Sequence, residues 1–302
     1  MPELNPVRAE MISALNDYFI TENSRSADYS FANICIWDER FRQSVAVCGK
    51  RLVTLLYRRD EPYFAFPVGS GDLLPAFAFM RSYCRERSIP LRLCGVTEEQ
   101  LALLSSAFPG QLDAAEDRDF ADYLYAVDSL ADYPGKHLHS KRNFCHRFEA
   151  EHDWCFSPLT RELFPDCLAM LCEWTQQSAE RLADDISYEH SAIMRGFEHF
   201  ELFALEGGVL YADGKIVGFT VGERIAADTY CTHFEKAFPD IVGAYPVLCR
   251  ETAKQIIRKH PDIRYVNRED DMGNPALRRS KLSYCPAELL MKYIVSEKQN
   301  VL

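Results

Sequence analysis

The order of apolar and polar residues predicts strands and helices in the same series twice along the chain. In the first half, alternating or continuous apolar runs separated by polar or glycine breaks predict a helix over 6–20, strands over 45–48, 52–58 and 63–68, a helix over 73–87 and a strand over 91–94. Thr97 then provides an N-cap for a further helix, and residues 123–127 predict the final strand of this half.

The second half repeats this plan with a different sequence. Asp213-Gly214, a two-residue signal for a type I′ hairpin, separates predicted strands over 203–211 and 215–223. The pattern then predicts a strand over 229–238, a helix over 243–260, a strand over 263–267, a helix over 274–283 and a strand over 289–295. In each half, a strand leads through a glycine-containing loop and a helix to another strand, which we expect to lie parallel to the first. Pro134 and Gly135 interrupt the pattern, so we predict two domains, 1–134 and 135–302.

The composition is typical of a globular protein with two domains of ordinary size. Of the 302 residues, 47% are hydrophobic and 26% are charged, and no apolar run approaches the roughly 18 residues of a membrane helix. Because the N-terminal segment also lacks the apolar core of a signal peptide, we expect a cytoplasmic protein without a transmembrane segment. The net charge of −11 argues against non-specific binding to nucleic acids or anionic membranes, although local basic segments remain.

The cysteines and histidines do not predict a metal site. The 11 cysteines are scattered and form no C-x-x-C pair, so we expect them to be reduced and mostly packed in cores. The two histidines of His137-Leu138-His139 fall on different faces of a predicted helix, which is unlike a zinc site. The chain also lacks P-loop, Rossmann, G-x-S-x-G and H-E-x-x-H motifs. We therefore expect no bound metal.

The densest group of charged residues follows the predicted strand at 263–267. Four charged residues, Arg268 to Asp271, stand side by side there, and Asn274 with Pro275 then begins a short basic helix. Charged groups at a buried strand end cost free energy unless they pair with one another or bind a ligand. This stretch therefore favours a binding site over a merely structural loop.

A second segment, residues 136–148, is basic in an acidic chain and predicts a helix. It contains Lys141, Arg142 and Asn143, followed by Arg147 and Phe148, in the order K-R-N-x-x-x-R-F. Together with the stretch at 265–284, this segment resembles the C-terminal family of lysyl-phosphatidylglycerol synthases. The resemblance extends over about residues 18–295, and these two segments carry it.

The resemblance implies an α+β fold made by tandem duplication of acetyltransferase-like (GNAT-like) domains of the Fem type. Each domain would have a twisted mixed sheet flanked by helices. In GNAT folds two central parallel strands splay apart and admit the acyl donor, which here indicates the ends of the strands at 229–238 and 263–267. The same resemblance places the segment 136–148 between the domains, beside the substrate channel. A structural strut between domains would explain its charges almost as well.

The two strand ends bring together side chains suited to acylation of an amine. A base must take a proton from the attacking amine, and a cation or N–H donors must stabilise the oxyanion. Glu269 and Asp270 are our first candidates for the base, and Glu235 and His233 are the next. Cys231, His233 and Glu235 alternate along their strand, so we expect them to share one face. A structural ion-pair network is the alternative interpretation.

The remaining candidates would bind a small anionic or phosphate-bearing substrate. Arg278 and Lys281 share one face of the basic helix near its N-terminal amides, although a solvated basic face would have the same pattern. The full set of predicted substrate-binding residues is Lys141, Arg142, Asn143, Arg147, Asn267, Arg268, Arg278, Lys281 and Tyr284.

The loop before the helix at 243–260 departs from the pyrophosphate loop of CoA-dependent GNAT enzymes. That loop has the pattern Q/R-x-x-G-x-G/A, and its best register here starts at Asp240 and retains only Gly243. Asp240 would repel a phosphate, and Tyr245 replaces a small residue. Gly243, Ala244 and Tyr245 are the positions where such a cofactor would bind. The departure agrees with the Fem-like branch, whose members use aminoacyl-tRNA.

The sequence therefore predicts an acyltransferase, in particular an aminoacyltransferase similar to the catalytic region of phosphatidylglycerol lysyltransferase. The donor would be an aminoacyl-tRNA, with tRNA as a partner, and the acceptor would be a lipid headgroup or a small amine. Two alternatives stay open. One is an N-acetyltransferase of a small amine with acyl-CoA as donor, and the other is a non-catalytic protein of the same fold that binds an anionic ligand.

Overall fold

The computed structural model describes residues 2–178 and 183–298. The chain forms two compact units whose segments alternate along the sequence. The first unit contains residues 1–122, 270–273 and the segment from Leu290 onward, and the second contains residues 123–269 and 274–289. Where the sequence predicts a single boundary at residue 134, the units change between Asp122 and Tyr123, and the chain later returns to the first unit.

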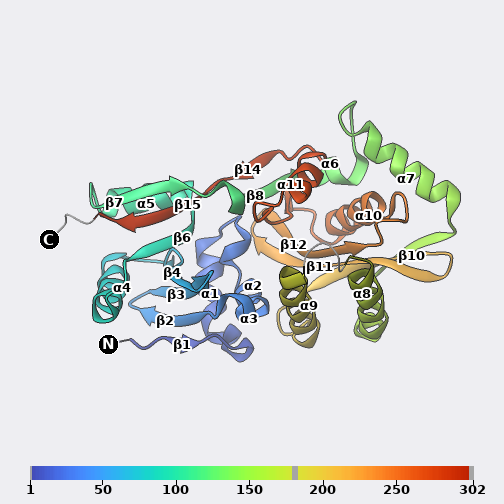
Figure 1. Ribbon diagram of the computed structural model, residues 1–302. Helices are drawn as coiled ribbons and strands as arrows, with labels where there is room; N and C mark the ends of the chain where they lie inside the picture. Colours follow the sequence, from blue (N-terminus) through green and yellow to red (C-terminus); the bar gives the residue numbers. More distant parts are fainter. Residues whose placement is uncertain (1, 179–182, 299–302) are drawn as a thin grey trace. The chain divides into compact units, whose positions relative to one another are not determined.

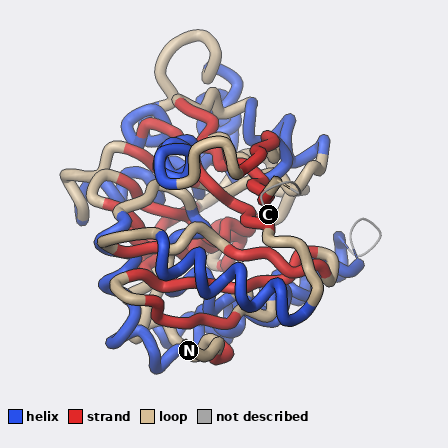
Figure 2. The backbone as a smooth tube through the Cα atoms, turned by 90° about the vertical axis from the view of Figure 1, so that its left-hand side faces the viewer, coloured by secondary structure: helices blue, strands red, loops and turns tan. Residues whose placement is uncertain are grey.

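The first unit is built on a mixed sheet in the order β1-β2-β3-β4-β6-β15-β7, with β5 paired to β3. Its strands are β1 Asn5–Pro6, β2 Ser44–Cys48, β3 Arg51–Arg58, β4 Glu61–Phe64, β5 Val68–Gly69, β6 Arg92–Thr97, β7 Leu112–Glu116 and β15 Lys292–Glu297. Its helices are α1 Ile12–Glu22, α2 Phe31–Ile36, α3 Asp38–Phe41, α4 Leu74–Arg87 and α5 Glu98–Ala107, with 3-10 turns at Ala9–Met11, Ala27–Tyr29 and Arg118–Phe120. Figure 2, coloured by secondary structure, shows the strands running beside one another with helices packed against them.

The second unit is built on a sheet in the order β14-β8-β13-β12-β11-β10-β9. Its strands are β8 Asp122–Ala126, β9 Trp154–Pro158, β10 Glu206–Ala212, β11 Lys215–Ala226, β12 Thr229–Ala237, β13 Tyr265–Asn267 and β14 Glu288–Leu290. Its helices are α6 Val127–Asp132, α7 His139–Glu151, α8 Phe164–Ser178, α9 Ala183–Glu198, α10 Ala244–Lys259 and α11 Pro275–Leu282, with a 3-10 turn at Arg161–Leu163. In Figure 1, α10 covers one face of this sheet, and α8 and α9 lie on the other.

Local sequence signals account for several of these elements. Asp213 and Gly214 have φ angles of 52° and 77° and join β10 to β11 in a hairpin, as predicted. The Asn274 side chain caps α11 by accepting two backbone N–H groups of its first turn, and Pro275 occupies that turn. The parallel pairs β4–β6 and β12–β13 are also confirmed.

Two predicted strands lie in a different sheet from the one expected. The sequence predicts residues 123–127 as the last strand of the first half, but β8 pairs with β13 in the second sheet. Part of the strand expected at 289–295 is β15, which pairs with β6 and β7 in the first sheet. Lys292 anchors β15 there, because its ammonium group is buried against Asp122 and Asp28. The expected half is wrong for β8 and for β15, since alternation identifies a strand but not its partner.

Candidate functional site

The parallel strands β12 and β13 share only a short ladder. Residues 229–231 of β12 pair with residues 265–267 of β13, and β13 then ends while β12 continues to Ala237. α10 follows β12 and packs on the same part of the sheet (Figure 1). Beyond the ladder, side chains of β12 therefore contact the residues that follow β13.

A β-bulge at His233 changes the alternation of side chains along β12. Val221 pairs with Phe234 and Gly222 pairs with Thr232, so the ladder skips His233. His233 therefore lies with Cys231, whereas Glu235 lies with Thr232 at a small cavity. The expectation that Cys231, His233 and Glu235 share one face is wrong for Glu235.

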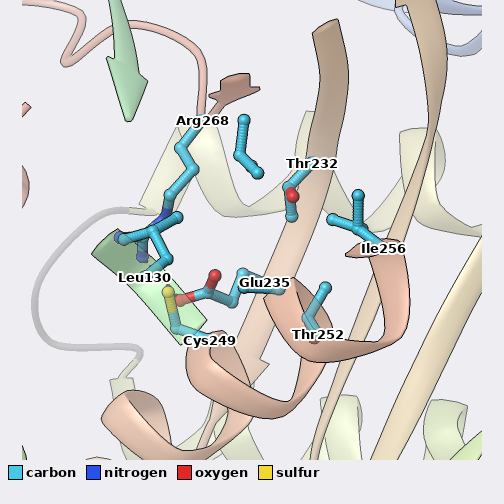
Figure 3. Close-up of a pocket in the computed structure, with 9 residues that line it drawn as sticks. Leu130, Thr232, Glu235, Cys249, Thr252, Ile256 and Arg268 are labelled. Atoms are coloured by element: carbon cyan, nitrogen blue, oxygen red, sulfur yellow. Dashed lines mark hydrogen bonds and ion pairs between the residues drawn. The ribbon is translucent and has the colours of Figure 1, made fainter. Parts of the chain in front are cut away.

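The cavity measures about 10 Å³, which is roughly the space of one water molecule. It is lined by Leu130, Thr232, Glu235, Cys249, Thr252, Ala253, Ile256, Val266 and Arg268. Figure 3 shows Arg268 and Glu235 pointing toward each other, with Leu130 and Cys249 beside them. Arg268 Nη2 donates to Glu235 Oε1 at 2.6 Å. This ion pair closes the gap between the separated strands.

The guanidinium of Arg268 is held by aromatic rings as well as by Glu235. Its central carbon lies 4.5 Å from the centre of the Tyr284 ring and 5.4 Å from that of Tyr125. The other terminal nitrogen, Nη1, is buried and has no hydrogen-bond partner among the described residues. A buried donor without a partner costs about 1–3 kcal/mol, so an acceptor that reached Nη1 would relieve this cost.

Lys141 of α7 adds a second cation to this group. Its Nζ lies 3.6 Å from the centre of the Tyr284 ring. Among the described residues, no carboxylate lies within ion-pair distance of this Nζ. Burial, and then the positive charge of Arg268, lower the pKa of Lys141 from 10.5 to about 8. A desolvated lysine beside another cation becomes available as a base or a nucleophile near neutral pH.

A separate polar cluster surrounds His233. Its Nδ1 lies 2.9 Å from Glu269 Oε1 and 3.6 Å from Cys231 Sγ, and its Nε2 lies 3.0 Å from Glu223 Oε1. Burial alone lowers the pKa of His233, but its interactions with Cys231, Glu223 and Glu269 outweigh burial and raise it well above 6.5. An imidazole held at both nitrogens in this way positions its neighbours and is not a free base.

The backbone at Glu269 directs its carboxylate toward His233. Glu269 has a φ angle of 55°, in the left-handed region that residues other than glycine rarely adopt. The buried Asn267 side chain accepts the Glu269 N–H at 2.7 Å, and Tyr123 N–H donates to the Glu269 carbonyl at 3.1 Å. Asn267, a predicted substrate-binding residue, therefore also fixes this turn.

This arrangement coincides with a family match that spans most of the chain. Residues 21–296 match the family model described as phosphatidylglycerol lysyltransferase, C-terminal. The chain belongs to this family. The resemblance predicted from residues 136–148 and 265–284 is thereby confirmed.

Solved structures show the same fold. A conserved protein of unknown function from Bacteroides thetaiotaomicron is 30% identical, with a TM-score of 0.92 over 99% of this chain and 100% of that one. L-PGS from Bacillus licheniformis is 14% identical, with a TM-score of 0.65 over 99% of this chain and 94% of that one. A tandem GNAT protein from the clavulanic acid biosynthesis pathway is 12% identical, with a TM-score of 0.52 over 99% and 98%. No curated protein matches.

The predicted fold class, a tandem duplication of GNAT-like domains with mixed sheets flanked by helices, is confirmed. Lysyltransferase C-terminal family membership and this fold together support an acyltransferase. Within the ranges that the structure describes, no helix is both long and apolar enough to cross a membrane, as the sequence predicts.

The family's basic segment contributes one residue to the group around Arg268. Lys141 contacts Tyr284, whereas Arg142 donates to two backbone oxygens of the segment before α7. Asn143 and Arg147 are exposed and interact with neighbours four residues away on α7. Arg142 therefore stabilises the segment before α7, whereas Asn143 and Arg147 lie on the surface.

The closing stretch of the family motif contributes through α11 and the turn before it. Lys281 Nζ donates to the Arg268 carbonyl at 2.5 Å, and Tyr284 is buried against Arg268. Arg278 lies half-buried on the same helix. Asp270 belongs to the first unit, where its carboxylate accepts the Met272 N–H at 2.9 Å.

The loop considered for CoA is occupied by helix packing. Gly243 has a φ angle of 92°, and a Cβ at this position would lie 2.2 Å from the Phe144 carbonyl oxygen and 2.8 Å from Phe148 Cβ. Ala244 is fully buried, and burial raises the pKa of Tyr245 to about 12. Gly243 thus permits α7 and α10 to approach each other closely.

Tyr125, Cys249 and Glu223 belong to these two groups but were not candidates from the sequence. Tyr125 Oη donates to the Lys281 carbonyl at 2.8 Å, which ties β8 to α11. A detectable signal existed only for Glu223, which is the charged end of a predicted apolar strand. Tyr125 and Cys249 sit in apolar patterns and could not be distinguished from core residues.

Proposed function

We propose that this protein transfers an aminoacyl group from an aminoacyl ester, such as aminoacyl-tRNA, to a phosphate-bearing acceptor such as phosphatidylglycerol. The proposal rests on two cations that lie against the same ring, that of Tyr284, beyond the β12–β13 ladder. Arg268 has a buried Nη1 without a partner among the described residues, and Lys141 has a lowered pKa. Membership of the phosphatidylglycerol lysyltransferase C-terminal family supports the substrate class.

In the proposed reaction, a hydroxyl or amine of the acceptor attacks the carbonyl carbon of the donor ester. Lys141 Nζ takes the proton from the acceptor, and Arg268 Nη1 donates a hydrogen bond to the carbonyl oxygen as negative charge develops on it. The bond from the carbonyl carbon to the ester oxygen then breaks, and the leaving hydroxyl takes its proton from Lys141. One preorganised donor of this kind lowers the barrier by about 2.7–4 kcal/mol.

Lys141 is a better candidate for the base than the acidic residues considered first. Glu269 and Asp270 already accept hydrogen bonds from His233 and from the Met272 N–H, and Glu235 is paired with Arg268. With a pKa of about 8, Lys141 would be uncharged in about a tenth of molecules at pH 7. Glu235 would then serve to orient the guanidinium of Arg268.

The reaction requires the Arg268–Glu235 contact to open. The cavity measures about 10 Å³, which is far smaller than an aminoacyl group. A substrate carbonyl that bound Nη1 would satisfy a buried donor, and this gain would help to offset the cost of separating the pair.

The direct test uses aminoacyl-tRNAs charged with labelled amino acids, offered with phosphatidylglycerol vesicles or with small amines. Label should move to an acceptor with the unmodified protein. Lys141→Met should lower the rate about 10²–10⁴-fold, the usual effect of removing a general base. Lys136→Met is the matched control, because Lys136 is an exposed lysine just before the same helix, and it should leave the rate unchanged.

Two outcomes would contradict the proposal. Label that stays on every tRNA offered, in low salt and with every acceptor, would remove the donor and favour the non-catalytic interpretation. Transfer from acetyl-CoA in place of aminoacyl-tRNA would favour the CoA-dependent alternative, which the packing of Gly243 against α7 argues against.

A further inference from the structure

The cluster around His233 takes no part in the proposed transfer step, yet it gathers three different metal-binding atoms. Cys231 Sγ, His233 Nδ1 and Glu269 Oε1 all lie within 4.8 Å of one another. Cys231 and His233 come from β12, and Glu269 follows β13. The three ligands therefore come from the two strands that separate at this point.

The distances between these atoms suit a tetrahedral ion. Zinc–sulfur and zinc–nitrogen bonds of about 2.3 and 2.05 Å at a tetrahedral angle place the two ligand atoms about 3.6 Å apart. Cys231 Sγ and His233 Nδ1 are 3.6 Å apart. The same geometry requires about 3.4 Å between the histidine nitrogen and a carboxylate oxygen, and Glu269 Oε1 lies 2.9 Å from Nδ1. Glu269 Oε1 would move about half an ångström away from Nδ1 to reach that separation, and all three ligand atoms already lie within 4.8 Å of one another.

Glu223 supplies the contact that metal-bound histidines usually make through their second nitrogen. Its Oε1 lies 3.0 Å from His233 Nε2. A carboxylate in this position fixes the tautomer that leaves Nδ1 free to bind a metal, and it makes the imidazole a stronger ligand. The β-bulge at His233 turns the ring toward both Glu223 and Glu269.

Burial distinguishes a metal site from a catalytic cysteine. A cysteine beside a histidine that is oriented by a carboxylate is also the arrangement of a thiol nucleophile. A nucleophile must reach its substrate, but Cys231 and the side chain of His233 are 0% exposed. Glu269 is 21% exposed and is the open side of the cluster. A small ion can be enclosed there during folding, whereas an acyl group cannot reach the sulfur.

We propose that Cys231, His233 and Glu269 bind one zinc-type divalent cation through Sγ, Nδ1 and Oε1. The mixed sulfur, nitrogen and oxygen set selects zinc over magnesium or calcium, which prefer oxygen ligands. Binding releases the thiol proton of Cys231 and any proton on Nδ1, while Nε2–H donates to Glu223. The fourth position, on the side of Glu269, takes a water molecule. The ion joins β12 to the turn after β13.

The test measures metal on the full chain and needs no transfer activity. The protein is freed of metal with a chelator, given zinc sulfate alone, desalted and analysed for zinc; one zinc per chain is expected. Cobalt(II) in place of zinc should produce the near-ultraviolet absorption of a thiolate–cobalt bond. Cys231→Ser should abolish that absorption. Cys285→Ser, which removes an exposed cysteine of the same unit, should retain it.

Glu223→Gln tests the site without removing a ligand. It should weaken zinc binding about 10–100-fold, as loss of a carboxylate that orients a histidine ligand usually does. Zinc should also raise the melting temperature of the unmodified protein, because a ligand that binds only the folded state stabilises it. The proposal is overturned by zinc content that stays near zero, by a cobalt spectrum without thiolate absorption, or by labelling of Cys231 with an aminoacyl group. Failure of the transfer assay has no bearing on these measurements.

Discussion

Two lysines, the buried Lys292 of the first unit and the half-buried Lys141 of the second, have opposite electrostatic surroundings. Lys292 of β15 places its Nζ 2.8 Å from Asp28 and 2.8 Å from Asp122, and the second oxygen of Asp122 accepts the Ala27 N–H at 2.9 Å. Burial alone lowers the pKa of Lys292, but Asp122 and then Asp28 outweigh burial and raise it. The charge is fully compensated, as a structural ion pair requires.

Lys141 faces an aromatic ring and an arginine instead of carboxylates, and its pKa falls to about 8. Its neighbour Arg268 retains a buried Nη1 without a partner among the described residues. Such incomplete pairing costs stability and persists only where it serves another purpose. The comparison teaches that complete compensation marks a structural cluster, whereas deficient compensation marks a candidate site.

The largest expected effect tests the structural side of the comparison. Lys292→Met leaves Asp122 and Asp28 without their cation and should lower the free energy of unfolding by about 3–5 kcal/mol. Unfolding in urea measures this change. Lys298→Met is the control, because Lys298 is 41% exposed and should have little effect. A loss below about 1 kcal/mol for Lys292→Met would show that the buried pair does not anchor β15.

Arg268→Lys tests the candidate site, where charge is incompletely compensated. The ammonium group keeps the charge beside Glu235 but loses the second donor and the planar contact with Tyr284. We expect kcat of aminoacyl transfer to fall about 10²–10³-fold, while the free energy of unfolding changes by less than about 3 kcal/mol. Arg279→Lys, at an exposed position of α11, is the matched control. An unchanged kcat would separate Arg268 from the chemistry.

The pKa of Lys141 predicts how transfer depends on pH. If Lys141 must be uncharged to accept a proton, kcat/KM should rise about tenfold per pH unit below pH 8 and level off above it. Lys141→Met should remove this rise along with most of the activity. A profile that levels off near pH 5 would instead indicate a carboxylate base.

The same group affects stability in a definite direction. Its folded pKa of about 8 lies below the ordinary value of 10.5, so between these values the unfolded chain binds more protons than the folded one. Stability from this group therefore rises with pH in that range, and the cost of burying the charge is fully present below about pH 8. Lys141→Met should flatten that slope in urea unfolding.

The sequence was sufficient for the elements that depend on neighbouring residues. Asp213 and Gly214 require a tight hairpin through their backbone preferences, and Asn274 with Pro275 starts α11 by satisfying its first N–H groups. The parallel pair β12–β13 followed from the strand–helix–strand order. The charged residues after β13 drew attention to Arg268 for a sound reason, because buried charge needs a partner.

The remaining features depend on residues that are distant in the sequence. Lys292 pairs with Asp122 across 170 positions, and no periodic pattern indicates that β15 enters the first sheet. The bulge at His233 reverses the face on which Glu235 lies, and a bulge of this kind leaves no signal in the alternation of residues. The lowered pKa of Lys141 arises from burial and then from Arg268, and only the fold creates this environment at α7.

The smallest expected effect concerns Arg147, six residues from Lys141 on the same helix. Its ion pair with Glu151 is exposed, with 56% and 48% of the two side chains accessible, so Arg147→Ala should change the free energy of unfolding by about 0.5 kcal/mol or less. Transfer should also be unchanged if α7 contributes through Lys141 alone. A loss of transfer at low salt that disappears at high salt would instead show that the exposed face of α7 contacts phosphates of the donor. The group of cations that serves the reaction would then extend from the cavity to the exposed face of α7.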